Sequence, residues 1–384
     1  MVVVDMTKEN RSVCIVSSVE EPSLAGIVPI RDMVNLFDRT HGRIILVTSS
    51  KLVEAMEGSS PKLETYRVDR PNNGQLPYRL VHYLLSQLRN ARIMLKIGDE
   101  VDEWLFFVGG DTQFLPAVLA RISGKPVHQL FGAASKETMR TYGRGAGILV
   151  PLLSLASRIN CALATQIVVY SENNLREYGL EPFRHKTVVS HRHVIDLDHF
   201  QETVPLAERG RIVAFMARLA HEKGIREFLE AVPLILDRDP DIHIRIYGTG
   251  MLEEEVRRSV GSIRSDRVEV MGWVAHRDMP LHLNQIKMLV MPSYAEGLPN
   301  VMLEAMACGA AVLVNPVGSI SEVVTDGVTG YLMHGNDPEE IAYRTLSTLE
   351  RDDLLEVASR GKDAVVEEFT FDRQVEKWRR LFYP

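Results

Sequence analysis

Short apolar runs rich in β-branched residues alternate with longer amphipathic runs through the second half of the chain. The apolar runs predict buried strands at 211–217, 242–248, 268–272, 288–293 and 311–316. Helical segments are expected between them, at 225–236, 253–260 and 301–308. Near-continuous apolar strands separated by helices are typical of a parallel sheet that is covered by helices on both faces.

The first half repeats this alternation less regularly. Strands are predicted at 13–18, 43–49, 104–110 and 166–171, and helices at 27–37, 76–94 and 114–122. A chain of 384 residues is too long for one comfortable hydrophobic core. We therefore expect an α/β protein with two doubly wound, Rossmann-like domains that face each other across a cleft.

The expected domain limits follow from the change in pattern between the halves. Residues 1–198 form the predicted first domain and residues 208–369 the second, with the irregular segment 191–211 as the connection. The last residues, 370–384, place apolar side chains near one face of a helix. We expect this final helix to pack back onto the first domain.

Composition excludes several classes of protein. A formal charge of −7 argues against nucleic-acid binding, and three scattered cysteines argue against a disulfide framework or a zinc site. No signal-peptide pattern opens the sequence, and Pro151, Arg158 and Asn160 interrupt its most apolar stretch. The expectation is a cytoplasmic protein, for which peripheral contact with a membrane stays open.

Candidate binding residues gather at the expected carboxyl ends of strands, where open parallel sheets bind ligands. Arg218 and Lys223 bracket the loop after one strand, and two such cations could hold a diphosphate. Taken alone, they would be interpreted as solvated loop charges. Gly248 and Gly250 would let the backbone approach a ligand closely, although an ordinary turn explains them equally.

A stretch of nine residues, PSYAEGLPN at 292–300, follows another apolar strand. Glu296 is expected in a strand-to-helix loop, and Glu304 about two turns further along the helix. These carboxylates could accept hydrogen bonds from sugar and ribose hydroxyls, with the amides of 297–300 facing phosphate. In the alternative interpretation, Glu296 caps the helix and Glu304 pairs with a neighbouring cation.

Five segments occur in one colinear series: ARLAHEKG, IRIYGTG, VEVMGWV, EGLPNVMLE and EAMACGAAVLVNPVGSISEVVTDGVTGYL. The series resembles the donor domain of the retaining GT-B glycosyltransferases of family 4. The resemblance implies that Arg218 and Lys223 grip the donor diphosphate, that Glu296 contacts the transferred sugar and that Glu304 contacts the ribose. The residues implied along the sugar and the phosphates are Gly297, Leu298 and Asn300.

The sequence departs from the family's pattern in both halves. Ala217 and Ser319 stand where glycine is common, and the first half has Gly26 alone where relatives often carry a glycine pair. Many relatives place a histidine just before a glycine at the position of Phe131, whereas this chain has His128 three residues earlier. His128 could substitute on the acceptor or sugar side, or it could be a buried structural histidine.

The resemblance implies a retaining, hexosyltransferase-type enzyme that uses a nucleotide-sugar donor and needs neither a metal nor a cofactor. A glycan, a lipid-linked molecule or a small molecule could be the acceptor. Two alternatives stay open: a GT-B-fold nucleotide-sugar epimerase, and a catalytically silent nucleotide-sugar binding protein. A nicotinamide dehydrogenase is disfavoured because the GxGxxG fingerprint is absent.

Overall fold

The computed structural model describes residues 11–18, 24–69, 76–131 and 146–383. The chain forms two compact units. The first comprises Met1–Arg192 with Gln374–Pro384, and the second comprises His193–Arg373. The division between them falls six residues before the end expected for the first domain at residue 198.

The described part of the first unit contains a seven-stranded sheet with the order β3-β2-β1-β4-β5-β6-β7, in which neighbouring strands run parallel. The central strands β1 and β4 are buried along their whole length, as their apolar sequences predict. The strands are β1 (Ser12–Val16), β2 (Arg43–Thr48), β3 (Leu63–Arg67), β4 (Glu103–Phe106), β5 (Val127–Leu130), β6 (Gln166–Val169) and β7 (Thr187–Val189).

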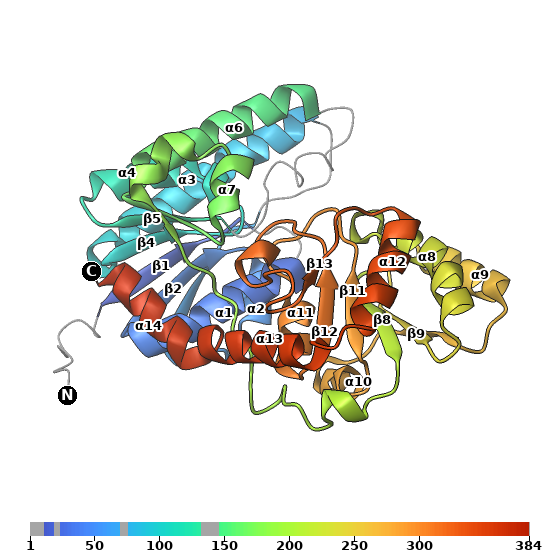
Figure 1. Cartoon of the computed structure of the whole chain (residues 1–384). Coiled ribbons are helices and arrows are strands. Elements are labelled where there is room, and N and C mark those ends of the chain that lie inside the picture. Colours follow the sequence, from blue (N-terminus) through green and yellow to red (C-terminus); the bar gives the residue numbers. More distant parts are fainter. Residues whose placement is uncertain (1–10, 19–23, 70–75, 132–145, 384) are drawn as a thin grey trace, which may run out of the picture. The chain divides into compact units, whose positions relative to one another are not determined.

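Helices cover both faces of this first sheet (Figure 1). Parallel strands need right-handed crossovers, so the helices before and after the reversal at β3 lie on opposite faces. One face carries α1 (Leu24–Thr40), α2 (Ser50–Ala55) and α14 (Phe371–Phe382). The other face carries α3 (Leu76–Ile97), α4 (Phe114–Ile122), α6 (Ala146–Leu163) and α7 (Glu172–Glu177).

The final helix α14 contributes its apolar face to the core of the first unit. Trp378 is fully buried, and its ring meets the ring of Phe37 on α1 edge to face at 6.2 Å. Its indole Nε1 donates a hydrogen bond of 3.0 Å to the carbonyl oxygen of His191. At the end of the helix, the Tyr383 hydroxyl donates to the carbonyl oxygen of Thr40 over 3.0 Å. The C-terminal segment of this unit begins at Gln374, four residues after the start that was expected at residue 370.

The described part of the second unit contains a six-stranded sheet with the order β10-β9-β8-β11-β12-β13. Its neighbouring strands are again parallel, which confirms the α/β class with two Rossmann-like domains. The strands are β8 (Ile212–Met216), β9 (His243–Tyr247), β10 (Val268–Gly272), β11 (Met288–Met291), β12 (Ala311–Val314) and β13 (Tyr331–Leu332).

Two apolar clusters fill the two faces of the second sheet. One cluster packs the apolar stripe of α8, which includes Phe228 and Val232, against β8 and β9. The other packs Met302 and Met306 of α11 against β11 and β12. The helices are α8 (Ile225–Arg238), α9 (Glu253–Ile263), α10 (Met279–Leu283), α11 (Asn300–Ala307), α12 (Pro338–Leu349) and α13 (Leu354–Glu368).

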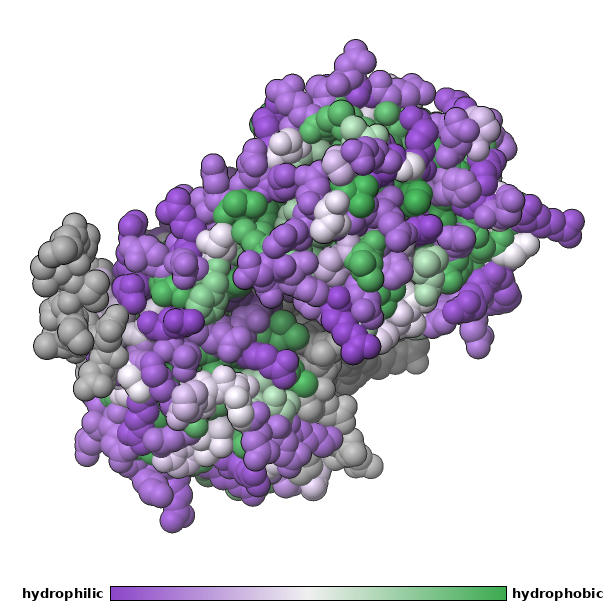
Figure 2. Space-filling model, turned by 90° about the horizontal axis from the view of Figure 1, so that it is seen from below, coloured by the Kyte–Doolittle hydropathy of each residue, from purple (hydrophilic) through white to green (hydrophobic). Residues whose placement is uncertain are grey.

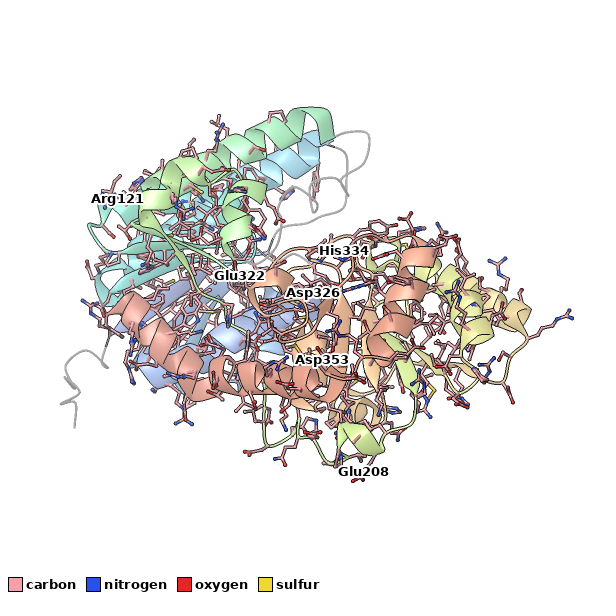
Figure 3. All side chains as sticks on the ribbon, viewed as in Figure 1. Arg121, Glu208, Glu322, Asp326, His334 and Asp353 are labelled. Carbon is pink, nitrogen blue, oxygen red and sulfur yellow. The ribbon has the colours of Figure 1, made fainter. Side chains whose placement is uncertain are left out.

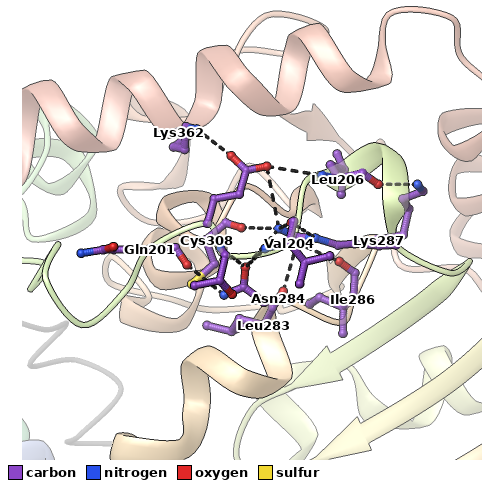
Figure 4. Close-up of polar contacts among 12 residues, drawn as sticks. Gln201, Val204, Leu206, Leu283, Asn284, Ile286, Lys287, Cys308 and Lys362 are labelled. Atoms are coloured by element: carbon purple, nitrogen blue, oxygen red, sulfur yellow. Dashed lines mark hydrogen bonds and ion pairs between the residues drawn. The ribbon is translucent and has the colours of Figure 1, made fainter.

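Most of the segment expected as a connection belongs to the second unit. Arg209 is 6% exposed, and its guanidinium donates hydrogen bonds of 3.1 Å to the carbonyl oxygens of Leu283 and Ile286 (Figure 4). Asn284 accepts a 2.7 Å hydrogen bond from the backbone N–H of Thr203. The segment is thus fastened by these polar contacts and by the isolated buried residues Ile195, Phe200 and Leu206, which form no regular apolar pattern, and this is why its sequence resembled a linker.

The predicted elements are found, whereas strands β3, β5, β7 and β13 were not predicted and the strand expected at 104–110 already ends at Phe106. The helix predicted at 114–122 has those bounds in α4, and each predicted strand of the second half is found within two residues at either end. No helix among the described residues is long and apolar enough to cross a membrane. On the face drawn in Figure 2, hydrophobic residues form small separate groups among hydrophilic ones.

Candidate functional site

The loops after β8, β9, β11 and β12 meet at the carboxyl edge of the second sheet, because the strands are parallel and adjacent. Glycines bring these loops together backbone to backbone. A Cβ atom on Gly248 would lie 1.9 Å from the carbonyl oxygen of Ala217, and one on Gly318 would lie 2.1 Å from that of Glu296. Both glycines have positive φ, at +121° and +59°. The close approach therefore requires glycine at both positions.

Lys223 and Glu296 form an ion pair at this edge. Lys223 ends the short helical turn His221–Lys223 after β8, and its Nζ lies 2.7 Å from Oε1 of Glu296, in the loop after β11. The Ser293 hydroxyl donates a 2.8 Å hydrogen bond to the same oxygen. The two charged side chains are only 17% and 7% exposed. A charged pair this far removed from water is costly unless it is well paired or serves a ligand.

Arg218 lies in the same loop as Lys223 but is much more exposed. Its side chain is 68% exposed and pairs with Glu222, whose carbonyl oxygen accepts a 2.9 Å hydrogen bond from the backbone N–H of Tyr294. Burial alone would raise the pKa of Glu222. The hydrogen bond between the Glu222 carboxylate and its own backbone, together with the charge of Arg218, outweighs burial, so the pKa of Glu222 is lowered. Glu222 therefore contacts the Arg218 guanidinium through its side chain and the loop after β11 through its carbonyl oxygen.

Two helices begin at this edge without a side-chain cap. Gly224 precedes α8 and Pro299 precedes α11, and neither provides a side-chain hydrogen bond to the first turn. The first N–H groups of a helix, together with its dipole, favour an anion. Gly297 and Leu298 lie just before α11, and Asn300 is its first residue. The edge thus combines two helix N-termini with two cations.

Glu304 lies in the second turn of α11 and has a different partner. Its side chain is 7% exposed and accepts a hydrogen bond from His276 Nε2 over 2.9 Å. This hydrogen bond raises the pKa of His276 above its usual value, although partial burial opposes the shift. The pairing with a neighbouring cation is the alternative considered for Glu304 from the sequence.

The predicted residues of the second unit are not all in direct contact with one another. Lys223 and Glu296 are in direct contact, and Arg218 is joined to the same loops through Glu222. Glu304 is linked instead to the loop after β10. Gly248 and Gly250 both pack against the loop that carries Arg218.

The predicted residues of the first unit lie in a different setting. The ring nitrogens of His128 are 3.0 Å from Gln166 Oε1 and 3.1 Å from Glu103 Oε2. Its ring also packs on Phe382 of α14, with centroids 4.3 Å apart. Glu103 begins β4, so these contacts lie toward the amino ends of the strands. They favour the structural interpretation of His128. Gly26 is buried in the first turn of α1.

Sequence reasoning missed three residues that shape the edge. Ser293 and Glu222 each hold a charged side chain of the site, and His276 holds Glu304. Glu222 follows Arg218 by four residues and Ser293 precedes Glu296 by three, but neither loop was expected to be helical, so these spacings predicted no pairing. His276 had no signal, since its partner Glu304 lies on a helix 28 residues further along the chain.

The comparisons with known proteins bear on this same unit. Residues 210–351 match the family model of the glycosyl transferases group 1. Residues 210–351 are therefore similar to the glycosyl transferases group 1. The matched segment contains Arg218, Lys223, Glu296 and Glu304, together with the glycines that join their loops.

Two curated relatives extend the comparison. The alpha-maltose-1-phosphate synthase of Mycolicibacterium smegmatis is 32% identical over 187 residues, which are 44% of this chain and 47% of that protein. The GDP-mannose-dependent monoacylated alpha-(1-6)-phosphatidylinositol monomannoside mannosyltransferase of Corynebacterium glutamicum is 23% identical over 92% of both chains. The chain spans just under half the length of the curated relatives that it matches first.

Solved structures show the fold of the whole chain. The crystal structure of Anabaena Alr3699/HepE in complex with UDP has a TM-score of 0.73 and 14% identity, over 97% of this chain and 99% of that one. With the two parallel sheets, this likeness gives the chain the GT-B fold. The segment that matches the group 1 model lies in the second Rossmann-like domain of that fold.

Proposed function

We propose that this protein is a glycosyltransferase that moves a sugar from a nucleotide-diphosphate donor onto an acceptor. The observation that carries the proposal is the Lys223–Glu296 pair, 2.7 Å long and mostly buried, at a sheet edge that also holds Arg218 and two uncapped helix N-termini. The match of residues 210–351 to the glycosyl transferases group 1 supports the proposed reaction class.

The chemistry follows from the charges at the edge. We assign the donor diphosphate to Arg218 and Lys223, where fixed cations and first-turn amides would stabilise the negative charge of the leaving group. Glu296, oriented by Ser293, would accept hydrogen bonds from the sugar hydroxyls. Glu304 would accept them from the ribose. Because protein cations would neutralise the diphosphate, the proposal includes turnover without a metal, measured as activity that persists after divalent cations are chelated.

The finer parts of the proposal rest on resemblance. Solved complexes of Anabaena Alr3699/HepE contain UDP, and one contains UDP-glucose. A relative from Corynebacterium glutamicum is named as GDP-mannose-dependent. We therefore propose a UDP- or GDP-linked hexose as donor, retention of the anomeric configuration, and an acceptor recognised by the first unit. The anomeric configuration of the product, read by NMR, tests retention.

The test measures release of nucleoside diphosphate by the full chain, first with a panel of UDP- and GDP-sugars and water as acceptor. Glu296→Gln is expected to lower kcat about 100-fold, a loss typical of removing one electrostatic contact to a transition state. Glu202→Gln is the matched control, because Glu202 pairs with Lys362 over 2.6 Å elsewhere in the same unit. Equal activity of Glu296→Gln and wild type would contradict the assignment.

The same assay separates the alternatives. An epimerase would convert the donor into its stereoisomer without net release of nucleoside diphosphate. A silent binding protein would bind the donor and leave it unchanged in the presence of every acceptor tested. A transferase is expected to release nucleoside diphosphate and to place the sugar on water or on an acceptor.

A further inference from the structure

Helix α3 presents apolar side chains to solvent along one face. Val81 is 54% exposed, Leu84 47%, Leu88 58% and Leu95 71%. Their spacing of three, four and seven residues places them on a single stripe of the helix. Isolated exposed leucines are ordinary, but a continuous apolar stripe indicates a surface that is covered by something.

The opposite face of α3 is buried and carries polar residues beside the core residues Met94 and Ile97. Gln87 and Asn90 are 1% and 3% exposed. The Gln87 amide donates to the carbonyl oxygen of Thr112 over 3.2 Å and accepts from the backbone N–H of Leu115 over 3.3 Å, and Asn90 donates to Gln113 over 2.8 Å. These hydrogen bonds bind the start of α4. They fix the rotation of α3, so the outward leucines are a property of the packed helix.

The two neighbouring helices also expose apolar residues. α3, α4 and α6 lie on the same face of the first sheet (Figure 1). Ile122 at the end of α4 is 75% exposed, and Leu155 on α6 is 57% exposed. We call this surface the α3–α4–α6 face and define it by its exposed apolar residues: Val81, Leu84, Leu85, Leu88, Leu95, Ile122, Leu155 and Ile159.

The charge of this face differs from that of the chain. Asp and Glu outnumber Lys and Arg by 51 to 44 in the sequence. The sequences of α3, α4 and α6 nevertheless contain no Asp or Glu. Their charged residues are all basic: Arg79, Arg89, Arg92, Lys96, Arg121 (Figure 3) and Arg158.

We propose that the α3–α4–α6 face binds the surface of an anionic lipid bilayer. Apolar side chains on a helix that lies in the plane of the interface bury themselves at the boundary between headgroups and acyl chains, while basic side chains meet anionic headgroups. A second copy of the chain, docked through the same face, would set cations against cations. The face therefore fits an anionic surface better than it fits itself.

The test is co-sedimentation of the full chain with large unilamellar vesicles, either of phosphatidylcholine alone or of phosphatidylcholine mixed with phosphatidylglycerol. Binding is expected to the anionic vesicles, to be much weaker to the neutral ones, and to fall as salt is added. This measurement needs no sugar donor, so its outcome is independent of the proposed enzymatic activity.

Three variants make the test specific. Leu84→Gln with Leu88→Gln is expected to weaken partition to anionic vesicles at least about tenfold. Arg92→Gln with Lys96→Gln is expected to weaken it roughly fivefold for each charge removed. Leu281→Gln, which alters a 67% exposed leucine of the second unit, is the control and should bind like wild type. Unchanged thermal unfolding shows that each variant is folded.

Three outcomes would overturn the proposal. If wild type does not bind anionic vesicles, or if the double leucine variant binds like wild type, the face is not a membrane surface. A dimer in analytical ultracentrifugation that the double leucine variant abolishes, with no vesicle binding, would assign the face to a second copy instead.

Discussion

At the scale of single residues, His276 and Glu304 form a pair whose charge depends on pH. The hydrogen bond to Glu304 raises the pKa of His276, so the imidazolium persists to a higher pH than in an unfolded chain. The stability that this pair contributes is fully present below the ordinary pKa of histidine. It is lost as the pH rises through the raised pKa of the folded state.

The shift can be measured directly. NMR titration of the His276 ring is expected to give a midpoint above about 6.5, the usual value for histidine. Glu304→Gln removes the charge that favours the imidazolium, so the midpoint should move down toward that value. Identical midpoints in wild type and variant would mean that Glu304 does not hold His276 as described.

The same scale shows what single residues of a sequence can and cannot reveal. The colinear motifs placed Lys223 and Glu296 in loops that had to share one sheet edge, because parallel strands end on one side. The direct contact between their side chains depends on Gly224, Gly248 and Gly318, which let the loops touch. Those backbone contacts are tertiary, and no local pattern encodes them.

At the scale of elements, glycines with positive φ are what join the loops of the site. A Cβ on Gly248 would lie 1.9 Å from the backbone of Ala217, whereas one on Gly327 would meet nothing within 4 Å. Both glycines have positive φ, at +121° and +69°. Alanine at Gly248 would thus meet a backbone clash in addition to conformational strain, whereas alanine at Gly327 would meet conformational strain alone.

Gly248→Ala is therefore expected to lower the free energy of unfolding by about 3 kcal/mol or more, because conformational strain and a steric clash act together. Gly327→Ala should cost only about 1–2 kcal/mol, the strain of a side chain in left-handed backbone. Urea unfolding followed by circular dichroism measures both. Equal losses would show that the loops do not rely on the contact at Gly248.

Helix α3 was predicted from the sequence, but the face that it buries was not. Its start and length were predictable from its composition and lack of breakers. The prediction of a helix at 76–94 did not include which face is buried; the structure buries Gln87 and Asn90 and leaves Leu84 and Leu88 exposed. The two buried amides hydrogen-bond to residues at the start of α4. Such tertiary hydrogen bonds cannot be predicted from the periodicity of α3.

At the scale of the whole molecule, each unit has its own parallel sheet and its own core. The four charged residues proposed to bind the donor all belong to the second unit, and their contacts lie within it. The first unit contributes a buried histidine and the α3–α4–α6 face. Donor binding and membrane binding are thus separate properties, which variants in one unit should alter without affecting the other.

The central claim is that Lys223, paired with Glu296, forms part of a nucleoside-diphosphate site. The most direct measurement is isothermal titration calorimetry of UDP and GDP with wild type, Lys223→Met and Lys362→Met, whose lysine pairs with Glu202 in the same unit. Loss of one charged hydrogen bond of about 1.5–3 kcal/mol predicts a Kd roughly 10- to 100-fold weaker for Lys223→Met. Lys362→Met should bind like wild type. A folded Lys223→Met variant with wild-type affinity for the bound nucleotide would contradict the account.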